Sequence, residues 1–218
     1  MAGQSLKLQA YQYIKDKIIQ CEYKPNMILN EEFLKEEIGV SRTPIRDALS
    51  RLEQEGLIYI MPKKGIMVTG LSIAENNMIF EIRMLYEPYA LENYGHLMSD
   101  NLLQKYFNIF SNGSDAMSDD DYFKCDDDFH RCLVDLINNK YITSTYEKIQ
   151  NQNFRFRILT GKRTIERLKH GNDEHLDIVN CLIKKDYVGA AAAMRNHLSR
   201  SKLANFEVLL SDVNSQIF

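Results

Sequence analysis

The chain has 218 residues and a formal net charge of −3, so its overall charge gives no sign of a polyanionic partner. Hydrophobic residues make up 44% and charged residues 26% of it, which is typical of a globular protein with room for two domains. It contains no apolar run of about 18 residues, and polar groups recur every few positions near its start. We therefore expect no membrane span, no secretory signal and a cytoplasmic location.

The cysteines give no sign of a metal or disulfide framework. Cys21, Cys125, Cys132 and Cys181 include no C-x-x-C pair and follow no regular spacing. This pattern argues against a thiolate zinc site and against a set of disulfides. We expect all four to be reduced thiols that fill the core.

The first 70 residues predict three helices and a hairpin. Apolar residues at three- and four-residue spacing indicate an amphipathic helix over residues 5–20, which "EYKPN" ends. Asn30 as N-cap and Gly39 in the left-handed conformation bound a short helix over 31–38. Ser41 can cap a third helix, whose first turn tolerates Pro44 and which runs to about Glu55. "LIYIM", "PKKG" and "IMV" then predict two strands around a tight turn.

Beyond residue 70 the patterns are helical. Met78, Ile82, Leu85 and Tyr89 are helically spaced, and Pro88 should remove one backbone hydrogen bond from their helix. Residues 111–121 predict a turn and an acidic helix start. In all, six helices are expected after residue 70. The predicted fold is mainly α, with a winged helix-turn-helix over 1–70 and an all-helical bundle over 71–218.

The third helix has two different faces. Ile45, Ala48, Leu49 and Leu52 form an apolar stripe, which leaves Arg42, Arg46 and Ser50 on the opposite face. A tight turn followed by a helix with exposed Arg and Thr near its start is the geometry of a recognition helix in the major groove. The lysine-rich hairpin turn beside it suits a wing that contacts the DNA backbone. Taken singly, an exposed arginine such as Arg51 is more often a solvated charge.

These residues carry a resemblance to a known family. "IGVSRTPIRDALSRLEQEGLI", with the G and V of "KKGIMV", resembles the winged helix-turn-helix of the GntR family of bacterial transcriptional regulators. By position, the resemblance implies a DNA-contacting set of Ser41, Arg42, Thr43, Arg46, Lys64 and Gly65. The family usually has glycines where this chain has Cys21 and Asn26. Some relatives also have arginine in place of Glu32, so one phosphate contact is expected to be missing.

A possible metal constellation lies in the second half. Asp126 and His130 are four residues apart, which places a carboxylate and an imidazole on one helical face. His175 and His197 would come from two other helices. Spacing alone does not make the four converge, and a single histidine is more often a hydrogen-bonded core or surface residue. We interpret the remaining two histidines, His96 and His170, as surface residues.

Resemblance assigns a role to that constellation. A GntR head followed by D-x-x-F-H, E-H and M-R-x-H-L resembles the FCD domain of the FadR subfamily, closest to its six-helix, VanR-type members. It implies that Asp126, His130, His175 and His197 hold a divalent ion, with zinc or nickel favoured and manganese or iron as alternatives. It also implies that residues 71–218 bind a small carboxylate effector and carry dimerisation. Arg83 is the first candidate for pairing with that effector, and a surface ion pair with Glu87 is its alternative role. Arg155 and Arg157 rank behind Arg83.

The favoured function is a homodimeric, effector-responsive regulator of repressor type. Each head would read half of a short, imperfectly palindromic operator in double-stranded DNA. Two alternatives remain open. The Asp/His₃ centre can serve a metal-dependent enzyme of small organic acids by activating water, or the ion can be purely structural. Because no further carboxylate or histidine is placed as a general base, we expect no enzyme.

Overall fold

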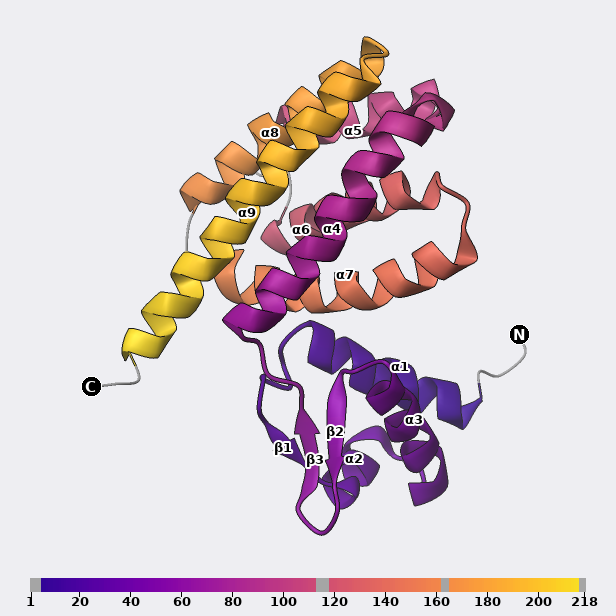
Figure 1. Ribbon diagram of the computed structural model, residues 1–218. Coiled ribbons are helices and arrows are strands. Elements are labelled where there is room, and N and C mark those ends of the chain that lie inside the picture. The colour runs from indigo at the N-terminus through magenta and orange to yellow at the C-terminus, as the bar shows by residue number, and fades with distance from the viewer. Residues whose placement is uncertain (1–4, 113–117, 162–164, 216–218) are drawn as a thin grey trace. The chain divides into compact units, whose positions relative to one another are not determined.

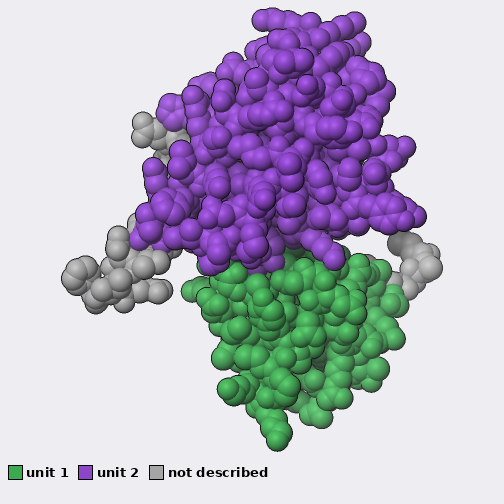
Figure 2. All heavy atoms as spheres, in the orientation of Figure 1, with its two compact units in different colours: residues 1–71 green, residues 72–218 purple. Residues whose placement is uncertain are grey.

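The computed structural model describes residues 5–112, 118–161 and 165–215. The chain divides into two compact units, unit 1 (residues 1–71) and unit 2 (residues 72–218), which Figure 2 distinguishes by colour. Because the expected turn over 111–121 includes residues 113–117, part of it lies outside the described residues. None of the helices in the described ranges is both long enough and apolar enough to cross a lipid bilayer.

The described part of unit 1 contains three α-helices, α1 (Leu6–Ile19), α2 (Glu31–Ile38) and α3 (Arg42–Gln54) (Figure 1). Helix α2 has the predicted bounds. The Asn30 side chain accepts a hydrogen bond from the Phe33 amide at 2.8 Å, and Gly39 follows the helix in the left-handed conformation, with φ 73°. Ser41 stands at the N-cap of α3, but its side chain makes no capping hydrogen bond. The predicted position of the N-cap is therefore confirmed, but the capping hydrogen bond is absent.

The sheet of unit 1 differs from the predicted two-stranded hairpin. In the described residues it has three antiparallel strands in the order β1-β3-β2, namely β1 (Ile28–Leu29), β2 (Ile58–Met61) and β3 (Gly65–Val68). Strand β1 pairs Ile28 with Met67 and Leu29 with Ile66. A two-residue strand is too short to show an alternating pattern, so only its pairing with β3 reveals it.

The turn between α1 and α2 uses left-handed backbone at the two positions where the resemblance predicted glycine. Cys21 has φ 55° and Asn26 has φ 65°. Asparagine tolerates this region, but an ordinary L-residue such as Cys21 is strained there by about 1–2 kcal/mol. Cys21 therefore lowers the stability of this turn relative to glycine at the same position.

One hydrophobic core holds unit 1 together. The apolar stripe predicted on α3 is buried, and it packs with side chains from α1, α2 and the sheet. Members of this core with no more than 1% exposure include Ile14, Ile18, Leu34, Ile45, Leu52, Ile58 and Val68. Full burial of such a side chain stabilises a fold by about 1.5–3 kcal/mol. Because this core fixes the inward face of α3, its polar face is turned to solvent.

The described part of unit 2 contains six α-helices and one short 3₁₀ helix, η1 (Gly95–Leu97), which agrees with the predicted number of α-helices. The α-helices are α4 (Ile73–Tyr94), α5 (Asp100–Asn112), α6 (Asp119–Asp135), α7 (Lys140–Gly161), α8 (Ile165–Ile183) and α9 (Tyr187–Ser215). Helices α4 and α9 run side by side, and α8 packs against both α5 and α9 (Figure 1). Helix α4 continues through the buried Pro88.

Helix α4 presents an apolar stripe to solvent. Met78, Leu85 and Tyr89 are 54%, 60% and 44% exposed, and Ile82 on the same face is half-buried. These are the residues whose spacing predicted the helix. The opposite face carries the buried side chains of α4, among them Phe80. The helix predicted from this spacing is confirmed, but the spacing does not tell which face of the helix is buried.

Candidate functional site

The polar face of α3 is exposed. The side chains of Arg42 and Arg46 are 62% and 65% exposed, and Thr43 and Ser50 are exposed beside them. Because α3 begins at Arg42, Arg42 and Thr43 lie in its first turn, where free backbone amides favour an anion. Arg46 and Ser50 follow about one and two turns further along the helix. The exposed face of α3 therefore presents two cations and two hydroxyl groups to solvent.

Both arginines form ion pairs with α2. Arg42 Nη2 donates to Glu32 Oε2 at 2.8 Å, and Arg46 Nε donates to Glu31 Oε1 at 2.9 Å. The hydrogen bond from Arg42 lowers the pKa of Glu32 to about 2. The same contacts raise the pKa of each arginine. From the sequence, Glu32 was interpreted as the place of a missing phosphate contact, and neither ion pair was predicted.

The hairpin turn between β2 and β3 carries exposed lysines. Lys63, with φ 64°, and Gly65, with φ 114°, shape the turn on either side of Lys64. A Cβ atom at Gly65 would lie 2.7 Å from the backbone oxygen of Leu29 in β1. Gly65 is therefore needed for the backbone path and for the close approach of β1, whatever it contacts outside the protein.

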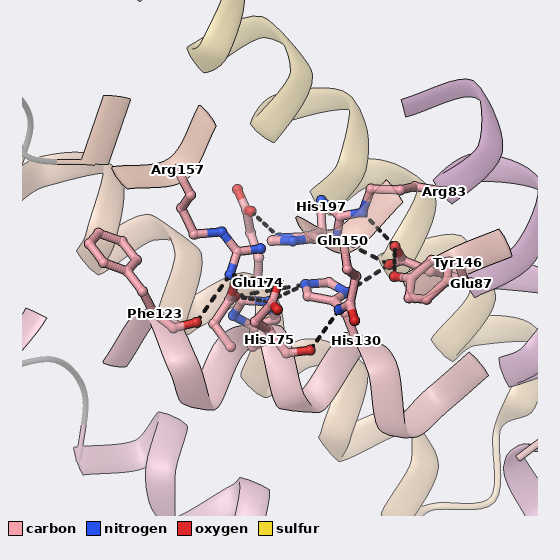
Figure 3. A network of polar contacts seen from close by, with 12 residues as sticks. Arg83, Glu87, Phe123, His130, Tyr146, Gln150, Arg157, Glu174, His175 and His197 are labelled. Atoms are coloured by element: carbon pink, nitrogen blue, oxygen red, sulfur yellow. Dashed lines mark hydrogen bonds and ion pairs between the residues drawn. The ribbon is translucent and has the colours of Figure 1, made fainter. Parts of the chain in front are cut away.

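The four expected metal ligands come together inside unit 2. Their donor atoms all lie within 4.8 Å of one another, and all four residues are buried: Asp126 and His130 on α6, His175 on α8 and His197 on α9. His175 Nε2 lies 3.2 Å from His130 Nε2 and 2.9 Å from Asp126 Oδ1. Figure 3 shows the three imidazoles directed toward one another. Helix packing thus brings about a convergence that spacing alone did not predict.

Two glutamates that sequence reasoning did not assign to the site orient these imidazoles. The Nδ1 atom of His130 lies 2.6 Å from Glu87 Oε2, and that of His197 lies 2.8 Å from Glu174 Oε2 (Figure 3). Each contact assigns the ring proton to Nδ1, which donates it to the carboxylate. The lone pair of Nε2 is then available to bind a metal ion. Carboxylates commonly hold metal-ligating histidines in this way. A sequence signal existed for Glu174, which directly precedes His175.

Glu87 is the centre of a buried polar network. Arg83 Nε donates to its Oε1 at 2.6 Å, and the Tyr146 hydroxyl donates to the same oxygen at 2.6 Å. Desolvation opposes ionisation of Glu87, but the charge of Arg83 and the contact with His130 outweigh it and lower its pKa. The Arg83–Glu87 pair exists, but it is not the surface pair that sequence reasoning considered, because the Arg83 side chain is only 2% exposed.

A second arginine contacts the ligand set directly. Arg157 on α7 forms an ion pair with Asp126 through Nη1, which also donates to the backbone oxygen of Phe123 at 3.4 Å. Arg155 is buried and donates to Gln152 Oε1 at 2.7 Å. In Figure 3, Arg83 and Arg157 flank the imidazoles on opposite sides. Arg157 is thus nearer to a ligand oxygen than its rank in the sequence analysis implied.

The cysteines and the other two histidines are not members of this cluster. His96 and His170 are exposed, as expected. All four cysteines are free thiols, but each is partly exposed, so the prediction that they fill the core was wrong in that respect. A small residue with a thiol is tolerated at the edge of a core as well as inside it.

The chemistry of the cluster fits a divalent ion. Zinc binds imidazole and carboxylate at about 2.0–2.2 Å, which separates neighbouring donors in a tetrahedron by roughly 3.3 Å. The 2.9 Å and 3.2 Å contacts at His175 are close to that spacing, and all four donor atoms lie within 4.8 Å of one another. Three imidazole nitrogens and one carboxylate oxygen are also a suitable donor set for several first-row metals.

Comparison with known proteins identifies both units. The family model "Bacterial regulatory proteins, gntR family" matches residues 6–68, and the FCD domain model matches residues 78–200. The HTH-type transcriptional repressor RspR of Escherichia coli is 28% identical over 214 residues, covering 89% of this chain and 86% of RspR. The chain is also similar to the crystal structure of a GntR regulator from Rhodococcus sp. RHA1, with a TM-score of 0.79 and 17% identity over 94% of this chain and 99% of that one.

One solved FCD domain was determined with a metal. The Zn²⁺-bound FCD domain of TM0439 superimposes with a TM-score of 0.56 at 22% identity, covering 65% of this chain and 99% of that domain. At this identity the likeness concerns the fold alone.

This chain belongs to the GntR family, in the group whose helix-turn-helix unit is followed by an FCD domain, and the FadR subfamily is consistent with that arrangement. It is therefore a transcriptional regulator and not an enzyme. Family membership thus decides between the regulator and the metalloenzyme, and GntR regulators act by binding DNA operators.

The Glu87 network generates a stability prediction. Glu87→Gln should lower the free energy of unfolding by about 3–5 kcal/mol, because it leaves the buried charge of Arg83 without its counter-ion. The double variant Arg83→Met/Glu87→Gln should regain about 1 kcal/mol or more of that loss, since no uncompensated charge remains. Urea denaturation of the three proteins measures both effects. A double variant that is less stable than Glu87→Gln would contradict this account.

Proposed function

We propose that this protein is a homodimeric transcriptional repressor that acts on cytoplasmic DNA and responds to a divalent metal ion and a small carboxylate effector. The observation that carries the proposal is the convergence of one carboxylate and three imidazoles in the FCD domain. The similarity to RspR, which is named a transcriptional repressor, supports the repressor assignment. The DNA-binding role of unit 1 and the sensing role of unit 2 are both parts of this proposal.

Asp126, His130, His175 and His197 would hold the ion. Glu87 and Glu174 support this assignment, because they keep two of the imidazoles turned with Nε2 toward the other ligands. The Zn²⁺ bound by the FCD domain of TM0439 supports zinc as the first metal to test, with nickel, manganese and iron as alternatives. When bound, the ion supplies a Lewis-acid site at which a carboxylate oxygen can bind.

An arginine beside the ligands would pair with the effector's carboxylate. Arg157 is better placed for this role than Arg83, because its guanidinium lies beside Asp126, which is one of the four ligands, although an effector would have to share that pair. Arg83 is occupied by Glu87, so for this arginine effector binding requires sharing or replacing that bond. We therefore retain Arg83 as a candidate and propose Arg157 as the principal effector cation.

The DNA-contacting set would be Ser41, Arg42, Thr43 and Arg46 on the reading helix, with Lys64 and Gly65 in the wing. The exposure of both arginines and the position of the hydroxyl groups at the start of α3 support this set. Arginine can hydrogen-bond guanine in the major groove, and Lys64 can contact a phosphate. Two such heads in a dimer would read a short, imperfectly palindromic operator.

The exposed stripe on α4 would be part of the dimer interface. A stripe of Met78, Ile82, Leu85 and Tyr89 has the apolar and aromatic composition of an interface centre. Large apolar side chains on one helical face expose a surface that association would remove from water. The family's regulators support a dimer as the assembly to test.

Metal binding is the first test. Purified protein should bind zinc at one ion per chain, and His175→Ala should weaken that affinity by about 100-fold or more, because it removes one donor. His170→Ala is the matched control, since it deletes an exposed histidine from the same helix and should change nothing. Competition with a coloured chelator measures all three affinities, and equal values for the three proteins would refute the site.

Effector binding, measured with and without the metal, can distinguish an ion that takes part in sensing from one that is only structural. A thermal-shift screen of small organic acids should give a stabilising compound whose effect disappears after chelation and in Arg157→Gln. If chelation lowers the melting temperature but leaves effector affinity unchanged, the ion is structural only.

Operator recognition is the second test. Arg46→Ala should weaken binding to an operator selected from random duplexes by about 1–3 kcal/mol if the arginine reads a base. Binding should also fall steeply with salt, because phosphate contacts release counterions. Electrophoretic mobility shifts at several salt concentrations measure both quantities. Wild-type affinity in the variant would exclude Arg46 from the reading face.

Dimerisation is the third test. Sedimentation should give twice the chain mass of 25.4 kDa, and Leu85→Lys should raise the dimer dissociation constant by about tenfold or more. Leu97→Lys is the control, because Leu97 is 55% exposed on η1 and lies outside the stripe. If both substitutions weaken the dimer equally, or if neither weakens it, the interface does not include the α4 stripe.

A further inference from the structure

The first turn of α2 faces the reading helix with two carboxylates. Glu32 contacts Arg42 at 2.8 Å, and Glu31 contacts Arg46 through both of its oxygens at 2.9 Å and 3.1 Å. Lys35 also donates to Glu32 at 2.6 Å. The two arginines that would enter the groove are thus each held by a carboxylate from the same unit.

These pairs matter because phosphate competes for the same guanidinium groups. Contact with the DNA backbone contributes most of the affinity for any sequence, and it depends on the number of cations free to neutralise phosphates. Residues 1–70 contain ten Lys or Arg and nine Asp or Glu, so the charge of this unit is close to neutral. Two carboxylates next to the reading arginines therefore remove a large share of its local attraction for DNA.

The geometry also restricts the direction of each arginine. Arginine is a long, flexible side chain, and an ion pair with a fixed carboxylate limits the rotamers it samples. A guanidinium held at Nε or at one Nη still has other N–H groups free to donate to a base. The pairs thus weaken phosphate binding and at the same time prepare the arginines for base contacts.

We propose that Glu31 and Glu32 are specificity-determining residues, which lower the affinity of the reading helix for arbitrary DNA while positioning Arg42 and Arg46 for base contacts at the operator. This inference rests on the DNA-binding role proposed for α3. It assigns to Glu32 a positive role, where the sequence comparison saw only a lost phosphate contact.

The variants Glu31→Gln and Glu32→Gln test this role. Each should raise affinity for a mixed-sequence DNA duplex by about three- to tenfold at low salt and steepen its salt dependence by about one counterion. Affinity for an operator selected with the wild-type protein should rise less, or fall, because the arginines lose their positioning. The ratio of operator to mixed-sequence affinity should therefore drop in both variants.

Glu36→Gln is the matched control. Glu36 lies on the same helix, is exposed and forms no ion pair with an arginine among the described residues. Its substitution changes the net charge by the same amount, so its affinities should change by less than about twofold. Thermal unfolding of all variants checks that α2 remains folded.

The possible results separate this inference from the proposed function. If Glu31→Gln and Glu32→Gln behave like Glu36→Gln, or if they raise operator and mixed-sequence affinity equally, the specificity role is overturned while DNA binding stands. If the wild-type protein binds neither the mixed duplex nor any selected duplex, the DNA-binding role of α3 fails and this inference fails with it.

Discussion

The buried carboxylate of Glu87 links three helices of unit 2 through hydrogen bonds. It lies on α4 and accepts hydrogen bonds from Arg83 on the same helix, from His130 on α6 and from Tyr146 on α7. A carboxylate without these partners would be costly to bury, and the network is stable only when every member is satisfied. The direction of the His130 ring therefore depends on the packing of all three helices.

Glu174 has the corresponding role on the other side of the cluster. It lies on α8, holds the His197 ring of α9 at 2.8 Å and also accepts from Arg200 at 3.2 Å. Together the two carboxylates turn imidazoles from α6 and α9 toward Asp126 and His175. An ion bound by these donors would be sensitive to small shifts of the three helices that carry them, as the proposed sensing role requires.

The parts of the fold predicted from sequence are those whose signal is local. The cap at Asn30 and the left-handed Gly39 act within four residues of their helix ends, so the sequence shows them directly. Strand β1 depends on pairing with residues far along the chain, and the Glu31–Arg46 pair joins residues 15 apart. Contacts of this kind come from tertiary packing, which local patterns do not contain.

The same distinction applies to the candidate site. Asp126 and His130 share a helical face by their spacing, but their meeting with His175 and His197 was implied only by resemblance. The Arg83–Glu87 pair was visible as an i, i+4 pair, whereas its burial and its contact with His130, 43 residues away, were not. The ligands are chemically distinctive residues, while a supporting glutamate looks like any other charged residue until its burial is known.

The near-neutral charge of unit 1 bears on how the proposed sensing of a ligand could alter DNA binding. A head with strong phosphate attraction would stay on DNA alone, whatever the position of its partner. If Glu31 and Glu32 offset the charge of Arg42 and Arg46 as proposed, a single head would bind DNA weakly, and tight binding would require two heads at matching half-sites. In the proposed dimer, a ligand that changes the placement of the heads can then change operator affinity strongly, because avidity is lost when the spacing no longer matches. In this proposal, the two glutamates of α2 make control by the FCD domain possible, because they keep the affinity of a single head low.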